Sequence, residues 1–217
     1  MSDGFLHKYF LNNPGRRLHK WTHYFDIYER HFERFRGKSP IVLEIGVFGG
    51  GSLDMWKAYF GPGVQIIGLD INPECKKLEG PSIEIFIGSQ DDENTLNSIK
   101  QKYGAFDIVI DDGSHMMSHM IKSFELLYEA VKEDGIYMVE DTHTCYWADY
   151  EGGLKREGSF LEFAKNKVDE LHAAFSQGQV PISNFTRSTD YIAFYDSIVV
   201  FEKRRQTKRG AGITHAM

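Results

Sequence analysis

The feature that most constrains this chain is an apolar segment that ends in a cluster of glycines. Positions 41–52 read Ile-Val-Leu-Glu-Ile-Gly-Val-Phe-Gly-Gly-Gly-Ser, and Leu-Asp-Met-Trp follows. An apolar run with β-branched residues, then glycines, then more apolar residues predicts a buried strand, a tight loop and the start of a helix. Backbone N–H groups of a glycine loop can approach a ligand closely, and the helix adds its positive end. The stretch is therefore typical of a nucleotide-type binding turn.

The glycine spacing differs from the dinucleotide-binding fingerprint G-x-G-x-x-G. Gly46 is followed by glycines at 49–51, and Glu44 lies two residues before Gly46. A carboxylate at that place would repel a phosphate but attract a ligand with ammonium and sulfonium charges, such as S-adenosylmethionine (SAM). The pattern therefore favours SAM, and a glycine-rich turn in some other doubly wound protein is the alternative.

The composition bounds the kind of protein. The 217 residues are 41% hydrophobic, which is enough for one sizeable core, so we expect a single domain. No apolar run is long enough to cross a bilayer and the N-terminus does not resemble a signal peptide, so we expect a cytoplasmic protein. Cys75 and Cys145 are expected to be reduced thiols. The net charge of −6 argues against a general nucleic-acid binder.

Strand and helix patterns alternate after residue 36. Such alternation predicts an α/β fold with a mainly parallel sheet, in which ligands bind outside the carboxyl ends of the strands. A closing hairpin adds the antiparallel ending of a Rossmann-like class I SAM-dependent methyltransferase, whose sheet has seven strands. After the strand that starts at Ile41, strands are predicted at 65–70, 83–87, 106–110 and 136–139, helices at 52–60, 93–103, 117–132 and 159–177, and the hairpin at 191–195 and 198–202.

The segment from Phe5 to Arg36 is aromatic and basic and precedes the first strand. Its aromatic residues recur at spacings of three and four, which predicts one amphipathic helix that packs on the sheet. It also has more polar heads than a covering helix needs, so it can close over a ligand. The aromatic residues are Trp21, Tyr24, Phe25, Tyr28, Phe32 and Phe35, and the polar heads are Lys20, His23, Tyr24 and His31.

Two polar sites follow the second and third strands. Asp70 ends the second strand, roughly twenty residues beyond the glycines, where an acid can accept hydrogen bonds from both ribose hydroxyls. Gln90 and Asp91 follow the third strand, where such a sheet would hold an adenine edge. The alternatives are that Asp70 is a turn or cap residue and that Asp91 and Asp92 only cap the next helix.

Acidic residues follow the fourth and fifth strands. Asp112, Glu140 and Asp141 would converge if these strands are neighbours, and they would repel one another unless they share a cation. Oxygen ligands suit Mg²⁺, with Ca²⁺ or Mn²⁺ as substitutes. His115, three residues after Asp112, is placed to accept the proton of a hydroxyl that the ion has acidified.

Two other interpretations of these residues remain open. In the first, Asp112 and His115 begin a helix, and Glu140 and Asp141 are a polar strand end. In the second, His115 and His119, which share a helix face, bind zinc together with His143.

The motifs together resemble a known enzyme family. The sequences Val-Leu-Glu-Ile-Gly-Val-Phe-Gly-Gly-Gly-Ser, Asp-Asp-Gly-Ser-His and Val-Glu-Asp-Thr-His-Thr-Cys-Tyr-Trp, with the region around Lys20-Trp21 and 28–32, are similar to the metal-dependent sugar O-methyltransferases of macrolide and aromatic polyketide biosynthesis. The likeness covers most of residues 18–147. Two departures limit it: the extra N-terminal domain of the most similar members has no counterpart here, and nothing after Trp147 fixes an acceptor.

The resemblance implies a set of functional residues. Asp112, Glu140 and Asp141 would bind Mg²⁺ and His115 would be the general base. We also predict contacts of Tyr24 and Asp111 with SAM. The residues that the resemblance and the glycine loop assign to SAM are Glu44, Gly46, Gly49, Asp70, Gln90 and Asp91.

These inferences combine into one expected function. The chain is predicted to be a Mg²⁺- and SAM-dependent O-methyltransferase that acts on a sugar hydroxyl of a glycosylated natural product, and to form a homo-oligomer. A catechol or other small-molecule O-methyltransferase, or a SAM-binding module without turnover, is the alternative. We expect a helical cover at 1–36, the methyltransferase domain at 37–204 and a solvated, mobile basic tail at 205–217, the basic residues near this end being Lys203, Arg204, Arg205, Lys208 and Arg209.

Overall fold

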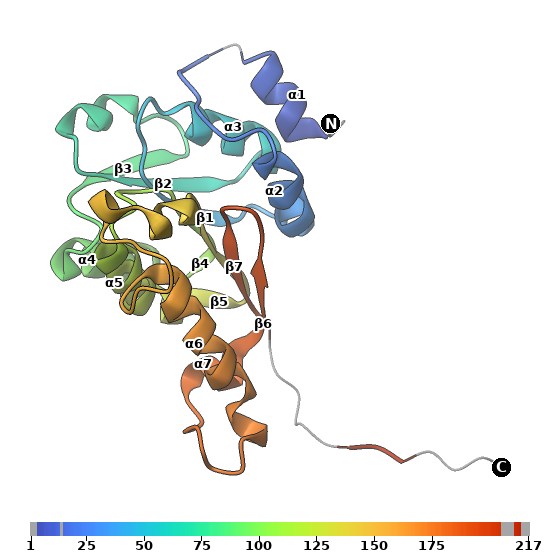
Figure 1. The fold of residues 1–217 in the computed structure, drawn as a ribbon. Helices are drawn as coiled ribbons and strands as arrows, with labels where there is room; N and C mark the ends of the chain where they lie inside the picture. The colour runs from blue at the N-terminus through green and yellow to red at the C-terminus, as the bar shows by residue number, and fades with distance from the viewer. Residues whose placement is uncertain (1–3, 14, 205–210, 214–217) are drawn as a thin grey trace.

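The computed structural model describes residues 4–13, 15–204 and 211–213, and its centre is a seven-stranded sheet (Figure 1). The strand order is β3-β2-β1-β4-β5-β7-β6. β1 to β5 are parallel, and β7 pairs antiparallel with both β5 and β6. This confirms the predicted mainly parallel sheet with a C-terminal hairpin. The strands are β1 (Ile41–Ile45), β2 (Gln65–Asp70), β3 (Ile83–Ile87), β4 (Phe106–Asp111), β5 (Val131–Val139), β6 (Thr189–Phe194) and β7 (Val199–Lys203).

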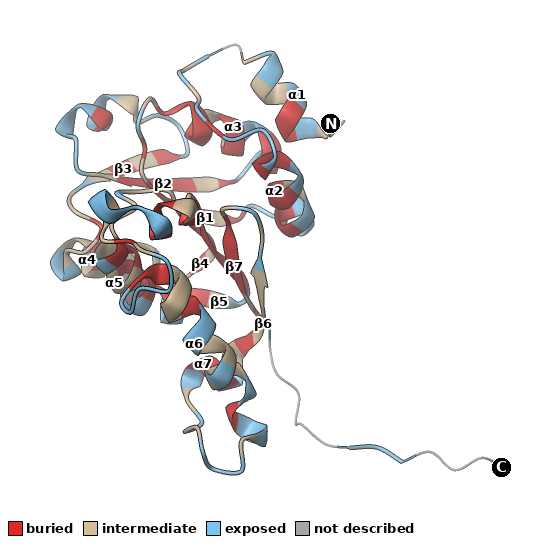
Figure 2. Cartoon of the chain, in the orientation of Figure 1, coloured by how far each residue is buried: buried red, intermediate tan, exposed pale blue. Residues whose placement is uncertain are grey.

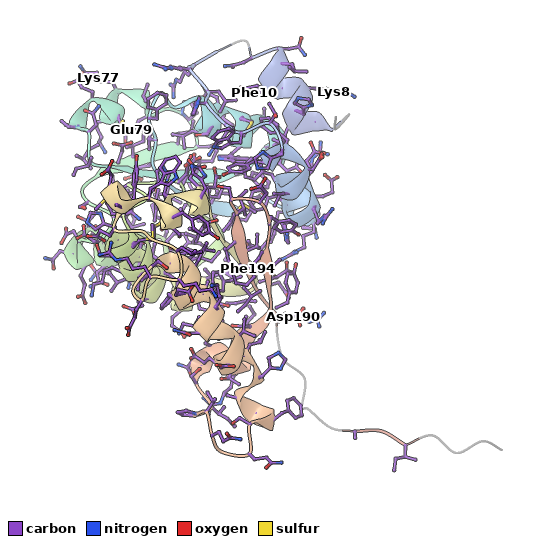
Figure 3. All side chains as sticks on the ribbon, in the orientation of Figure 1. Lys8, Phe10, Lys77, Glu79, Asp190 and Phe194 are labelled. Atoms are coloured by element: carbon purple, nitrogen blue, oxygen red, sulfur yellow. The ribbon has the colours of Figure 1, made fainter. Side chains whose placement is uncertain are left out.

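Helices cover both faces of this sheet because its central strands bury apolar side chains on each side. Val42 and Ile66 face one core, while Leu43 and Ile67, one position further on, face the other. Figure 2 shows the buried residues concentrated in these strands and on the inner sides of the helices, and the side chains drawn in Figure 3 fill the space between them. On the first face lie α1 (Phe5–Leu11), α2 (Tyr24–Phe32) and α3 (Gly51–Phe60), and on the second α4 (Glu93–Tyr103), α5 (Met117–Leu127) and α6 (Phe160–His172).

Short helices complete the chain. The short α-helix α7 (Asn184–Ser188) precedes β6 and was not predicted; it is held by a capping box between Ser183 and Thr186. The 3-10 helices are η1 (Glu33–Phe35), η2 (Pro73–Leu78), η3 (Tyr128–Ala130), η4 (Thr142–Tyr146), η5 (Ala148–Tyr150) and η6 (Ala173–Phe175).

The prediction of one helix over the aromatic segment 5–36 is wrong. The segment contains two helices, α1 and α2, and residues 15–23 between them run without helix across the edge of the sheet. The sequence Asn12-Asn13-Pro14-Gly15 lies at the break; proline removes a helical N–H and disfavours helix in the residue before it. We call residues 15–23 the strap.

Two predicted helices end earlier than expected. The helix predicted at 117–132 ends at Leu127, because Val131 already pairs with Phe106 at the start of β5. The register between these strands shifts after this pair, so residues 133–135, which separate the predicted helix from the predicted strand, form an irregularity within β5. The helix predicted at 159–177 ends at His172 and continues only as the 3-10 turn η6.

The basic end of the chain also differs from the prediction in part. Lys203 is not in a solvated tail: it is buried at the end of β7 and its ammonium donates to the Val131 carbonyl at 3.0 Å. Arg204 pairs with Asp190 at 2.8 Å. Arg205, Lys208 and Arg209 lie outside the described residues. Cys75 and Cys145 are free thiols, as predicted, and both are buried. In the described ranges, no helix has the length and apolarity needed to traverse a lipid bilayer.

Candidate functional site

A cavity of about 460 Å³ opens at the carboxyl ends of the central strands. The glycine loop after β1, the ends of β4 and β5, and the strap contribute its walls, so segments far apart in sequence meet there. A second cavity of about 170 Å³ adjoins it and shares Gly46, Asp70 and Gly113 with it. The strap thus closes over the cavity with Arg17 to Trp21, from the part of the N-terminal segment that is not helical.

The glycines allow three pieces of backbone to approach one another. Gly46 has a φ of 92°, and a Cβ there would lie 1.9 Å from the Asp112 carbonyl oxygen. Gly49 faces the strap instead, since a Cβ there would lie 2.8 Å from the Arg17 carbonyl oxygen, which also accepts from Gly51 N–H at 3.1 Å. Gly46 therefore lines the cavity, whereas Gly49 holds the strap against the loop.

Asp70 lies at the junction of the two cavities and organises the glycine loop. One carboxylate oxygen accepts from the backbone N–H groups of Val47, at 2.8 Å, and Phe48, at 3.0 Å, and the other accepts from Asn72 N–H at 2.8 Å. These three hydrogen bonds support the interpretation of Asp70 as a turn residue. Because Asp70 also lines both cavities, a ribose can still reach it.

Gln90 and Asp111 form a buried network behind the smaller cavity. Gln90 donates to Asp111 at 3.0 Å and accepts from Ser114 N–H at 2.6 Å, and Ser123 donates to Asp111 at 2.6 Å. Burial raises the pKa of Asp111, which borders neither cavity. Gln90 lines the smaller cavity, while Asp91 is partly exposed and pairs with His119 at 3.5 Å. Of these predicted SAM residues, only Gln90 has the placement of a ligand contact.

The ammonium of Lys20 lies among three of the carboxylates. It is 2.6 Å from Asp112 Oδ2, 2.8 Å from Glu140 Oε2 and 3.7 Å from Glu44 Oε1. Glu44 is fully buried and does not line the cavity. Lys20 and Ser52 lie between Glu44 and the cavity, and the Ser52 hydroxyl donates to the Glu44 carboxylate at 2.9 Å. Sequence reasoning marked Lys20 as a polar head of a helix and as part of the family resemblance. No local pattern pairs it with acids about 20 to 120 residues away.

This cluster has more acidic than basic groups. Burial raises the pKa of Glu44 to about 7 and that of Glu140 to about 8, although Lys20 acts to lower both. Burial alone would lower the pKa of Lys20, but Asp112, Glu140 and Glu44 outweigh it and hold that pKa well above its usual value. Oε1 of Glu140 makes no hydrogen bond to the described groups. One ammonium facing three acids leaves an environment that favours a further cation.

Asp112, His115 and Asp141 form the group that fits a metal ion. Ligand atoms of the three residues all lie within 4.8 Å of one another. His115 Nε2 is 3.9 Å from Asp112 Oδ1 and 3.7 Å from Asp141 Oδ2. His115 and Asp141 both have φ values above 50°, a sparsely populated conformation for such residues. The carboxylate oxygens of Asp112 and Asp141 are donors of the kind that Mg²⁺ prefers, and His115 lies beside them. Glu140, the third predicted ligand, does not belong to this group.

Tyr24 completes this group from the side of α2. Its hydroxyl donates to Asp141 Oδ1 at 2.6 Å and lies 3.2 Å from the Ser197 carbonyl oxygen. Burial raises the pKa of Tyr24, so its hydroxyl keeps the proton that it donates. The predicted polar heads His23 and His31 lie elsewhere: His23 contacts the Asp196 carbonyl oxygen, and His31 contacts Tyr195.

The three histidines of the zinc interpretation do not converge in the described part of the chain. His119 Nδ1 lies 2.9 Å from the Ser114 hydroxyl, and His143 bonds to the Ser197 hydroxyl. Neither belongs to the group around His115.

The fold and the site define a class of protein. A seven-stranded sheet in this order, with a cavity lined by the glycine loop and the strand-end acids, is the class I methyltransferase architecture. No protein-family model matches the chain. A structure titled as the MycE methyltransferase of the mycinamycin pathway in complex with Mg, SAH and mycinamycin VI superposes with a TM-score of 0.82 at 33% identity, over 92% of this chain and 53% of that chain.

Curated relatives define the family more closely. The 8-demethyl-8-alpha-L-rhamnosyl tetracenomycin-C 2'-O-methyltransferase of Streptomyces olivaceus is 34% identical over 203 residues, which are 89% of this chain and 52% of the relative. The mycinamicin VI 2''-O-methyltransferase of Micromonospora griseorubida is 36% identical over 210 residues, which are 89% of this chain and 50% of the relative. This chain is therefore a homologue of the sugar O-methyltransferases of macrolide and polyketide biosynthesis, and it spans about half the length of the relatives it matches.

Proposed function

We propose that this chain carries the methyl-transfer site of a Mg²⁺- and SAM-dependent O-methyltransferase that acts on a sugar hydroxyl of a glycosylated natural product. The observation that carries the proposal is the meeting of Asp112, His115 and Asp141 at the cavity beside the glycine loop. The homologues named above, two of which are sugar O-methyltransferases by name, give the reaction and the acceptor class.

We propose that SAM lies across the two cavities. Gly46 and Asp70 border both cavities, and Gln90 borders the smaller one, so a nucleoside that lay across the two cavities would contact all three. Ser52 and Lys20 stand between Glu44 and the cavity, so the Glu44 carboxylate would attract the cationic end of SAM once the Lys20 ammonium moves aside. Gly49 would then act indirectly by holding the strap against the glycine loop. Asp91 and Asp111 would act indirectly through their contacts with His119 and Gln90.

Asp112 and Asp141, with Glu140, are the proposed metal ligands. Once bound, Mg²⁺ would lower the pKa of an acceptor hydroxyl. Glu140 and Asp112 both hold the Lys20 ammonium, so Glu140 can join the ligand set only if that ammonium moves aside. Tyr24 keeps Asp141 oriented toward His115 through its hydrogen bond.

His115 is the proposed proton acceptor. Its Nε2 lies 3.9 Å from Asp112 Oδ1 and 3.7 Å from Asp141 Oδ2, so it stands beside the proposed metal ligands, within reach of a hydroxyl bound there. The hydroxyl oxygen then forms its bond to the methyl carbon as the bond from that carbon to sulfur breaks, and the electron pair stays on the thioether. The proton ends on His115 and no other reactant is needed.

The test is methyl transfer from SAM to a rhamnoside, with and without a chelator. We expect transfer that depends on Mg²⁺ and falls by about 100-fold or more in Asp112→Asn. Isothermal titration with S-adenosylhomocysteine should show that this variant still binds the cofactor product. Binding without any transfer would identify a SAM-binding module instead.

The remaining proposals concern the setting of this site. We propose that residues 1–36 act as a cover, that 37–204 form the catalytic domain, that the protein works in the cytoplasm and that it forms a homo-oligomer. Light scattering on the purified chain measures its oligomeric state directly.

A further inference from the structure

A row of aromatic rings runs from His115, the proposed base, to Trp21 of the strap, and these two end members line the cavity. The His115 ring is 6.4 Å from Tyr150, Tyr150 is 5.9 Å from Trp147, and Trp147 is 4.8 Å from His143. The His143 ring is 5.8 Å from Trp21, which lies in the strap and lines the cavity. We call these five residues the aromatic row.

The two tryptophans of the aromatic row are exposed although their rings are large. Trp21 is 51% exposed and Trp147 is 50% exposed, whereas the third tryptophan, Trp56, is fully buried in the core. A set of adjoining rings, two of them exposed, that begins and ends at the lining of a cavity marks a place where a ligand binds.

The backbone under the aromatic row is held in place. Trp147 N–H donates to the Thr144 carbonyl at 2.9 Å, and the Trp147 carbonyl accepts from Gly152 N–H at 2.8 Å. A Cβ on Gly152 would lie 2.5 Å from the Thr144 carbonyl oxygen, so the loop is closed tightly. A fixed loop thus holds Trp147. The side chains of this loop would therefore lose less conformational entropy when a ligand binds.

The orientation of the rings decides which kind of ligand fits. Neighbouring rings meet at 53°, 55°, 64° and 85°, so no neighbouring pair forms the parallel slot that a planar aromatic ligand needs. A pyranose ring is puckered and carries weakly positive C–H groups on one face, which the negative face of a single indole attracts. Its hydroxyl groups remain free to point toward His115.

From this geometry we propose that the aromatic row is the acceptor subsite and binds the pyranose ring through Trp147 and Trp21. The inference rests on the proposed function and adds the residues that select a glycoside over a planar phenol. A sugar seated on Trp147 presents one edge along Tyr150 toward His115, where the hydroxyl to be methylated gives up its proton.

Tryptophan fluorescence tests this binding without any turnover. Because Trp56 is buried, acrylamide quenches mainly Trp21 and Trp147. We expect methyl α-L-rhamnopyranoside to reduce the quenching constant by about twofold, since it would cover one face of each exposed indole, and sorbitol, which has no ring, to leave it unchanged. In Trp147→Leu, the sugar should no longer protect Trp21. Absence of protection in the wild-type protein would overturn the inference.

Kinetics separate this inference from the proposed function. Trp147→Leu and Trp21→Leu should each raise KM for the rhamnoside by about tenfold, the effect of one lost stacking contact, with kcat within about twofold and circular dichroism unchanged. The control is Phe175→Ala, which removes an aromatic ring that is 74% exposed on η6, beyond the end of α6. An unchanged KM with active enzyme overturns only the subsite. Transfer to catechol but to no sugar overturns both.

Discussion

The ammonium of Lys20 lies 2.8 Å from Oε2 of Glu140, although the two residues are 120 positions apart in the chain. The same ammonium lies 2.6 Å from Asp112, so it occupies the space between two of the acids that the sequence assigns to a metal ion. Lys20 belongs to the strap, and this contact ties the strap to the ends of β4 and β5. A divalent ion and the Lys20 ammonium therefore compete for the same carboxylates.

Replacing Lys20 by methionine should strengthen Mg²⁺ binding. The variant keeps the length of the side chain but removes the competing charge, so we expect the Kd for Mg²⁺, measured by isothermal titration, to fall by about tenfold. The control is Lys77→Met, on the exposed helix η2 at the periphery of the molecule (Figure 3). An unchanged Kd in Lys20→Met would mean that the ion and the ammonium occupy separate places.

Replacing His115 by alanine should slow methyl transfer without weakening SAM binding. Loss of a general base lowers kcat by about 100-fold to 10,000-fold. Single-turnover assays with rapid quenching measure the chemical step, and titration with S-adenosylhomocysteine measures binding of the cofactor product. His172→Ala, an exposed histidine at the end of α6, serves as the control. A kcat that stays within about twofold of the wild-type value would exclude His115 as the base.

Replacing Gly46 by alanine should disable the site. The new methyl group would collide with the Asp112 carbonyl, 1.9 Å away, and the φ of 92° disfavours any side chain. Asp112 must then shift, and a misplacement of about 1 Å can cost about 100-fold in rate. The matched control is Gly80→Ala, because a Cβ there meets nothing within 4 Å. Both variants should be compared by kcat/KM; equal values would refute the close contact between the two loops.

Replacing Glu202 by glutamine should reduce stability more at neutral pH than in acid. Burial alone would raise the pKa of Glu202, but hydrogen bonds from His31 and Tyr191 and the charge of Arg34 lower it from 4.5 to about 2. The ionised carboxylate therefore stabilises the fold above about pH 4.5, and this contribution is lost as the pH falls toward 2.

Thermal melts at pH 7 and pH 3 measure this effect. At pH 7 the Tm of Glu202→Gln should lie roughly 2–4 °C below that of the wild type, the shift for ~1 kcal/mol once solvent screening is allowed for. The difference should shrink at pH 3. Glu157→Gln, an exposed substitution in the loop before α6, is the control. A deficit of the same size at both pH values would contradict the low pKa.

Local patterns sufficed for much of the fold. The apolar strands and the glycine loop could be located because burial in a parallel sheet requires continuous β-branched runs. Helix ends were less reliable: the helix predicted to reach 132 stops at Leu127, since pairing of Val131 with Phe106 overrides local helix preference. The resemblance to sugar O-methyltransferases, based on the motifs at 42–52, 111–115 and 139–147, is confirmed by the homologues.

The sequence by itself determined which chemistry is available, because the carboxylates and His115 follow directly on strands whose ends must share one edge of the sheet. Only the tertiary structure decided how these groups are partnered. The strap places the Lys20 ammonium between Asp112 and Glu140. Asp141 instead accepts a hydrogen bond from Tyr24 and lies beside His115. Contacts between residues about 90 to 120 positions apart depend on the path of the chain in space, and no pattern of neighbouring residues encodes that path.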